Sequence, residues 1–199
     1  MTKKLILASG SEIRQQLLRN AGVSFEIQKA RVDESLVRDS MVSGDSSPRD
    51  IADALAELKA LKVSQKHRRN LVLGCDQVLD LNGCILSKPQ DKQEARRQLL
   101  QMRGQEHRLI SAAVICEDAR PIWRHVGQVR MRMRVFSEDY LDGYLERNWP
   151  AVSGCVGAYQ LESEGIRLFS QIDGDYFSVL GLPLLELLNY LTVRGDLQA

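Results

Sequence analysis

The chain has 199 residues, of which 44% are hydrophobic and 27% are charged, as in a globular domain with a sizeable core. Lys and Arg number 27 against 26 Asp and Glu, and this balance excludes an overall electrostatic attraction to nucleic acid or to a membrane surface. The four cysteines form no C-x-x-C pair, which favours free thiols in a reducing cytoplasm. The apolar run that begins at Leu5 stops at Ala8, which is too short for a secretory signal or a membrane span.

The first elements indicate a strand that leads directly into a helix. Residues 4–8 form a short apolar run that is typical of a buried strand, and the small residues 9–11 follow as a turn. Ser11 is a suitable N-cap for the helix, and Gly22 ends it. The apolar positions of this helix are Ile13, Leu17, Leu18 and Ala21, which recur on one face.

The next part of the chain indicates a loop, a helix and a second strand. Residues 30–46 are polar and are predicted to be rich in loops. A helix over about 48–63 begins at Ser47-Pro48, because proline is favoured in the first turn of a helix. Residues 71–75 predict a second buried strand, and we expect Asp76 to lie just past its end.

The remainder of the chain indicates further strands and helices. The expected elements are a hairpin over 78–85 turned at Asn82-Gly83, a helix from the capping box at Asp91 to about Met102, strands over 109–116 and 126–136, a helix over 138–147, a short β-like segment over 165–169 and a helix over 184–193. Strands that alternate with helices and then pair in longer runs predict an α/β fold with a mixed, twisted sheet flanked by helices. No repeat or Pro/Gly-rich linker divides the chain, so we expect a single domain over residues 1–199.

The junction of the first strand and helix has the residues of a phosphate site. Ser9 and Ser11 offer hydroxyl groups, the helix start offers backbone N–H groups, and Arg14 offers a fork of donors. A capped helix with a surface arginine explains the same spacing equally well.

A second candidate is Asp76 with its neighbour Gln77, because a carboxylate at a buried strand end can bind a metal ion or accept a proton. The alternative is an aspartate that caps a turn.

The third candidate is Lys88, in a loop stiffened by Pro89, which could contact a phosphate. Most lysines in loops are only solvated.

Taken in chain order, these residues resemble the motifs of the Maf family. The matching segments are Leu7-Ala8-Ser9-Gly10-Ser11-Glu12-Ile13-Arg14, Val32-Asp33-Glu34, Leu55-Ala56-Glu57-Leu58-Lys59-Ala60, Asp76, Lys88-Pro89, Gly104 with His107, Gly174-Asp175-Tyr176 and Gly181-Leu182-Pro183. The resemblance covers nearly the whole chain. It departs from the family pattern at Glu12, where the family has proline.

The resemblance implies a Maf/ITPase-like fold with a cleft between two lobes, and a nucleoside triphosphate pyrophosphatase. Such an enzyme hydrolyses the bond between the α and β phosphates and releases a nucleoside monophosphate and pyrophosphate. It implies Asp76 as the proton acceptor, with phosphate contacts from Ser9, Ser11, Arg14, Lys59 and Lys88. Glu34 and Asp76 would hold a divalent cation, Mg²⁺ or Mn²⁺, because these ions prefer oxygen ligands. A homodimer is also expected.

Three positions are similar to the YceF branch of the family, whose implied substrate is 7-methyl-GTP. Gln77 follows Asp76, Glu162 stands where the dTTP/UTP branch has glutamine, and residues 155–159 replace that branch's lysine-containing run. A glutamate can accept hydrogen bonds from a guanine edge and favours a cationic methylated base. Ile13 departs from the aromatic residue of the YceF branch, and it cannot stack on a base as tryptophan would.

Other interpretations stay open at this point. The substrate could be dTTP, UTP or an inosine-type nucleotide, or the protein could bind nucleotides as a cell-division regulator without turnover. Arg130, Arg132 and Arg134 alternate with apolar residues, which favours a solvated sheet face or dimer edge over a nucleic-acid or membrane stripe. His107 could ligate a metal ion, although the resemblance implies that it supports the pocket.

Overall fold

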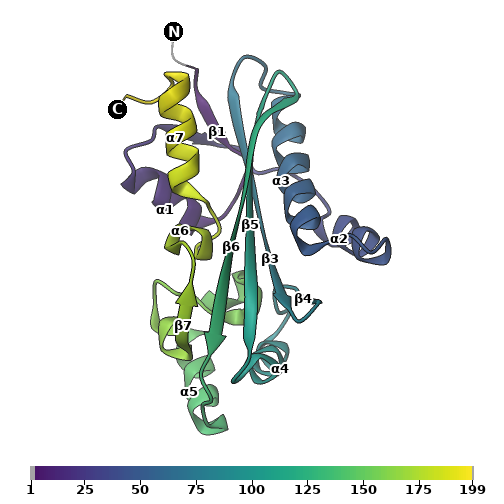
Figure 1. The fold of residues 1–199 in the computed structure, drawn as a ribbon, viewed down its shortest axis with the longest axis vertical. Helices are drawn as coiled ribbons and strands as arrows, with labels where there is room; N and C mark the ends of the chain where they lie inside the picture. Colours follow the sequence, from purple (N-terminus) through teal and green to yellow (C-terminus); the bar gives the residue numbers. More distant parts are fainter. Residues whose placement is uncertain (1–2, 199) are drawn as a thin grey trace.

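The computed structural model describes residues 3–198 and shows a mixed seven-stranded sheet with helices on both faces (Figure 1). The strands are β1 (Leu5–Leu7), β2 (Phe25–Ile27), β3 (Leu71–Leu81), β4 (Cys84–Leu86), β5 (Glu106–Glu117), β6 (Arg120–Met133) and β7 (Phe169–Asp173). The α-helices are α1 (Glu12–Asn20), α2 (Glu34–Ser43), α3 (Pro48–Ser64), α4 (Lys92–Met102), α5 (Glu138–Asn148), α6 (Tyr176–Val179) and α7 (Leu184–Arg194). The strand order is β2-β1-β3-β5-β6-β7, with β4 paired to β3, so the predicted α/β class and mixed sheet are confirmed.

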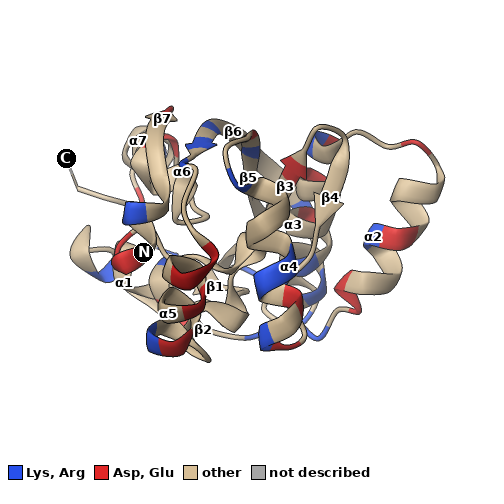
Figure 2. Ribbon diagram, turned by 90° about the horizontal axis from the view of Figure 1, so that it is seen from below, with Lys and Arg blue, Asp and Glu red and all other residues tan. Residues whose placement is uncertain are grey.

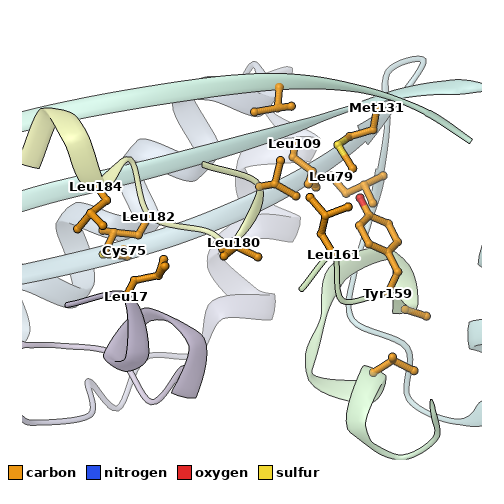
Figure 3. Packing of buried hydrophobic residues seen from close by; sticks show 14 of the residues in the cluster. Leu17, Cys75, Leu79, Leu109, Met131, Tyr159, Leu161, Leu180, Leu182 and Leu184 are labelled. Carbon is orange, nitrogen blue, oxygen red and sulfur yellow. The ribbon is translucent and has the colours of Figure 1, made fainter. Parts of the chain in front are cut away.

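The central strand β3 contributes side chains to two separate hydrophobic cores, because successive residues of a strand point to opposite faces. Val72 and Val78 pack in the smaller core, which includes Leu55 and other residues of α3. Leu73 and Leu79 pack in the larger core on the opposite face, with residues from α1, α4, α5 and α7. Figure 3 shows part of this larger core around Leu79. Buried groups on β3 are therefore divided between the two sides of the sheet.

Helix α3 lies very close to β3 because Gly74 has no side chain. A Cβ atom at this position would lie 2.1 Å from the carbonyl oxygen of Ala56 and 2.7 Å from the backbone nitrogen of Ala60. Both distances are far below van der Waals contact, so the backbones of helix and strand could not keep this spacing with any larger residue. The close approach places Lys59, which lies between these two alanines, against β3.

One edge of β3 is open in the middle of the strand. On this edge β1 pairs only with residues 71–73 and β4 only with residues 79–81. On the other edge β5 pairs with β3 from Val72 to Asp80, including Asp76 opposite Ala112. The prediction that Asp76 follows the end of a strand is therefore wrong. The strand continues through it because the antiparallel partner β5 satisfies its backbone groups.

Two further predictions of local structure are wrong. Residues 30–46 are not mainly loop, because α2 occupies Glu34–Ser43 and begins at an N-cap, Asp33, whose side chain accepts from the backbone of Leu36. Residues 165–169 are not a β segment: a 3-10 helix covers Glu164–Leu168, and β7 begins at Phe169. The sequence analysis also missed β2 and α6, which are only three and four residues long.

Other predicted elements are confirmed. The hairpin between β3 and β4 turns at Asn82-Gly83, where both residues have positive φ angles of 53° and 89°. Asp91 caps α4 as expected, and α7 covers the predicted C-terminal helix. The arginines of β6 are exposed and alternate with buried Val129, Met131 and Met133, and Figure 2 shows them as a blue band on this strand. Within residues 3–198, no helix has both the length and the hydropathy required to cross a membrane.

Candidate active site

A pocket of about 490 Å³ lies beside the open edge of β3. Its volume falls in the range of sites for small ligands. The ten predicted site residues all line it: Ser9, Ser11, Ile13, Arg14, Glu34, Lys59, Asp76, Gln77, Lys88 and Glu162. They come from segments far apart in the sequence, so the fold itself brings them together. The lining has two parts, a charged end from residues 9–14, 34–38, 59, 76 and 88, and a less charged end from residues 151–162 with 179–180.

A lysine between two carboxylates forms the centre of the charged end. The ammonium group of Lys59 lies 2.6 Å from Oδ1 of Asp76 and 2.9 Å from Oε1 of Glu34. Lys59 and Asp76 are only 6% and 5% exposed, so their contact is shielded from solvent. Oδ2 of Asp76 is also buried and has no hydrogen-bond partner within residues 3–198. An unpartnered carboxylate oxygen in a pocket is available to a proton or to a metal ion.

The two carboxylates have opposite pKa shifts. Burial raises the pKa of the Asp76 carboxyl above its ordinary value, although Lys59 and Arg14 act in the other direction. Burial also raises the pKa of Glu34, but the nearby cations, led by Lys59, outweigh it and hold this pKa below its ordinary value. Asp76 is therefore the stronger base of the two, as a proton acceptor requires.

Arg14 connects three segments at the bottom of the pocket. Its Nε donates to the carbonyl of Gly181 at 2.7 Å, and its Nη1 donates to Ser9 Oγ at 3.2 Å and to the carbonyl of Cys75 at 3.1 Å. Its Nη2 donates no hydrogen bond within residues 3–198, so part of the fork is free for an anion. Ser11 caps α1 by accepting from the backbone of Arg14, as predicted. The helix cap is therefore confirmed, and the same residues line the pocket.

Gln77 points to the opposite face of the sheet from Asp76, because the two are neighbours in a strand. Its Nε2 lies 2.9 Å from Ser111 Oγ and 3.1 and 2.9 Å from the carbonyl oxygens of Ser178 and Val179. The amide nitrogen therefore holds the segment around Val179, which lines the less charged end of the pocket. Its amide oxygen is the part of Gln77 with which a base could interact.

The less charged end consists of short turns rather than long elements. The 3-10 segments Ala151–Gly154 and Val156–Ala158 lead to Tyr159, which lines the pocket together with exposed Glu162. The hydroxyl of Tyr159 lies 2.8 Å from Nε2 of His107. Burial lowers the pKa of His107 to about 4, so its ring is neutral at neutral pH and supports the tyrosine.

The donor set suits a divalent cation only in part. No cluster of three or more His, Cys, Asp or Glu side chains that could hold a metal ion occurs within residues 3–198. Glu34 and Asp76 offer two carboxylates with a buried free oxygen, and Mg²⁺ is commonly held by one or two carboxylates together with substrate phosphates. The residues present therefore fit a cation that arrives with a phosphate substrate.

A family model described as Maf-like protein matches residues 4–194. The chain belongs to the Maf family. A nucleoside triphosphate pyrophosphatase of Ruegeria pomeroyi is 60% identical over 98% of both chains, and one of Ruegeria sp. (strain TM1040) is 58% identical over the full length of both. A 7-methyl-GTP pyrophosphatase of Brucella suis is 46% identical over 94% of both. These comparisons confirm the predicted enzyme class of this Maf protein, a nucleoside triphosphate pyrophosphatase that hydrolyses phosphoanhydride bonds.

The Maf pocket also contains charged and aromatic residues that the sequence analysis missed. Arg38 lines the charged end, and Tyr159 lines the other. The sequence analysis missed Arg38 because its segment was predicted as loop. The signal was present in the spacing of Val37 and Met41, four residues apart, which pack as partly buried residues against the smaller core.

Proposed function

We propose that this Maf protein hydrolyses the α–β phosphoanhydride bond of a nucleoside triphosphate, with 7-methyl-GTP or another modified or non-standard nucleotide as its preferred substrate. The observation that carries the proposal is Asp76, a buried carboxylate with a raised pKa and an unpartnered oxygen in the charged end of the pocket. In the proposed reaction Asp76 accepts a proton from the attacking water. The oxygen of this water bonds to the α-phosphorus, the bond from that phosphorus to the α–β bridging oxygen breaks, and pyrophosphate leaves with that oxygen.

The charged end of the pocket suits a triphosphate, which brings about four negative charges to the site. The free Nη2 of Arg14 and the exposed ammonium group of Lys88 would contact phosphate oxygens directly, with hydroxyl groups from Ser9 and Ser11 beside them. Lys59 keeps Asp76 oriented. A divalent cation, Mg²⁺ or Mn²⁺, would be held by Glu34 and Asp76 and would supply charge neutralisation at the phosphates.

The choice of base rests on the less charged end. Glu162 is exposed at the pocket and is an anion that favours a cationic methylated guanine and accepts from its N–H groups. The name of the Brucella suis relative supports this substrate, whereas the names of the Ruegeria relatives specify no base. Ile13 lines the same pocket and offers apolar contact to a base without aromatic stacking. The homodimer and the cytoplasmic location stay predictions.

The proposal is tested by pyrophosphate release from a panel of 7-methyl-GTP, GTP, UTP, dTTP and ITP, with Mg²⁺ or Mn²⁺. We expect 7-methyl-GTP to have the highest kcat/KM of the panel and Asp76→Asn to remove nearly all turnover of every substrate. A preference for UTP and dTTP would exclude 7-methyl-GTP as the preferred substrate but would agree with hydrolysis of the α–β bond. Tight nucleotide binding with no turnover of any substrate would exclude the reaction and favour a regulator.

A further inference from the structure

Arg38 is a charged residue of the pocket to which the proposed reaction assigns no role. It lies on α2 four residues after Glu34, so the two side chains share one face of the helix. Both line the charged end of the pocket. Arg38 is half-buried there, unlike the exposed side chains on the outer face of the helix.

Arg38 also connects α2 with the loop of Lys88. Its Nη1 donates to Ser87 Oγ at 3.1 Å, directly before Lys88 in the chain. Helix α2 has no buried residue and is held by partly buried Val37 and Met41 on the smaller core and by contacts at the pocket. These include the hydrogen bond to Ser87 and the ion pair of Glu34 with Lys59. The Arg38 side chain is thus held at the pocket while most of its N–H groups stay available, because a guanidinium has five.

The positively charged side chains at this end are mostly engaged by groups of the protein, so the phosphates of a substrate need a further cation. Lys59 is shared by two carboxylates, and three of the Arg14 contacts go to the protein itself. The less charged end of the pocket includes residues 151–162, whose 3-10 turns lie against α4 and β3, whereas Arg38 reaches the pocket from α2 at the charged end. A base at that end would direct the terminal phosphates toward α2.

We propose that Arg38 binds the two terminal phosphates, the part of the substrate that leaves as pyrophosphate, and so selects triphosphates. The guanidinium fork forms charge-assisted hydrogen bonds with phosphate oxygens, and α2 brings this fork to the site together with Glu34. The inference deepens the proposed function and rests on its orientation of the nucleotide. It adds a residue for specificity toward the phosphate chain rather than toward the base.

The test measures binding of inorganic pyrophosphate and of 7-methyl-GMP, each with Mg²⁺, by calorimetry. We expect Arg38→Gln to weaken pyrophosphate binding about tenfold to hundredfold, the effect of losing charged hydrogen bonds, and to change 7-methyl-GMP binding less than about twofold. The matched control is Arg97→Gln on α4, where the side chain is 76% exposed and, among residues 3–198, pairs only with Glu94, and it should change neither. Ser87→Ala removes the tether but keeps the guanidinium, so pyrophosphate binding should weaken by less than about threefold.

Three results would overturn the inference. Pyrophosphate binding could be unchanged in Arg38→Gln, both ligands could weaken in parallel, or Ser87→Ala could weaken pyrophosphate binding as much as Arg38→Gln. The third result would show that Arg38 only positions the loop of Lys88. Turnover of the wild-type protein separates the two proposals. If the wild-type protein shows no turnover but Arg38→Gln weakens pyrophosphate binding, the proposed reaction is excluded. If turnover is normal and Arg38→Gln leaves pyrophosphate binding unchanged, only the role of Arg38 is excluded.

Discussion

The two ends of the pocket are built in different ways. At the charged end, Arg14, Lys59 and Asp76 are buried and project from α1, α3 and β3. At the other end, exposed Glu162 follows short 3-10 turns that join α5 to β7. These three charged groups are fixed by close contacts inside the fold, whereas Glu162 is exposed at the pocket.

This difference indicates how reaction and specificity are separated in the molecule. Groups on helices and strands are held by many neighbours, so their distances vary little. Residues in exposed turns can change without disturbing the core. We therefore expect substitutions at the charged end to reduce rate or stability strongly, and substitutions at the other end to alter preference among bases. The following predictions test this contrast.

The largest effect is expected for Asp76→Asn. The amide cannot accept the proton from water, so kcat should fall by about 100- to 10,000-fold, the usual contribution of a general base. The circular dichroism spectrum should be unchanged, because Lys59 keeps its contact with Glu34. The measurement is the rate of pyrophosphate release. A kcat within a factor of a few of wild type would remove Asp76 from its role.

Lys59→Ala should reduce stability more than any surface substitution. It leaves the buried Asp76 carboxylate without its partner, a loss of about 3–5 kcal/mol in the free energy of unfolding at neutral pH. The loss should shrink at low pH, because protonation removes the buried charge of Asp76. Urea unfolding at two pH values measures both effects, and Lys62→Ala on the same helix is the control. Equal stability of the two variants would contradict a shielded ion pair.

The titration of Asp76 offers a milder test at the same end. Burial raises the pKa of this carboxyl in the metal-free protein, so NMR of its carboxyl carbon should show a titration above the ordinary range of aspartate. Lys59→Gln removes the cation that lowers this pKa, so the titration should move to still higher pH. A titration that stays in place in Lys59→Gln would contradict a direct effect of Lys59 on Asp76.

His107 should make the folded state sensitive to acid. Its pKa of about 4 lies below that of the unfolded chain, so the unfolded state binds a proton first as pH falls from about 6.5. Stability is therefore complete above pH 6.5 and should decrease by about 2 kcal/mol at pH 5. Urea unfolding of wild type and His107→Gln measures this, and the variant should lose this part of the pH dependence. The same slope in both proteins would contradict a buried neutral ring.

The smallest effect is expected for Glu162→Gln. Loss of an exposed charge near a cationic base should lower the ratio of kcat/KM for 7-methyl-GTP over UTP by about fivefold, since an exposed charge contributes about 1 kcal/mol or less. The absolute kcat should stay close to wild type. A large fall in kcat with an unchanged ratio would reverse the roles assigned to the two ends.

Much of the fold was predictable because its signals are local. The caps at Ser11 and Asp91 and the turn at Asn82-Gly83 depend on residues a few positions apart, and the structure confirms them. The end of β3 was misplaced for the opposite reason. Asp76 is polar and follows a glycine by two positions, yet β5 pairs with it from 36 residues farther along the chain, at Ala112.

The candidate site was predicted from the order of motifs rather than from the chemistry of single residues. By itself, Asp76 was as compatible with a turn cap as with catalysis, and Lys88 with plain solvation. The pairing of Lys59 with Asp76 depends on how α3 packs on β3, which no local pattern shows. Arg38 was missed because the polar segment 30–46 concealed a helix whose apolar side is narrow.

Gly74 has a consequence for how this enzyme can change over time. The residue carries no functional group, yet its missing Cβ allows the backbone of α3 to lie against β3, and the 2.6 Å contact of Lys59 with Asp76 depends on that spacing. Any side chain at position 74 would push α3 away from β3. This shift would separate Lys59 from Asp76 although neither residue is changed. We therefore expect a larger residue at position 74 to reduce activity although it carries no group of the pocket. An inactive variant could arise here with every polar group of the pocket still present.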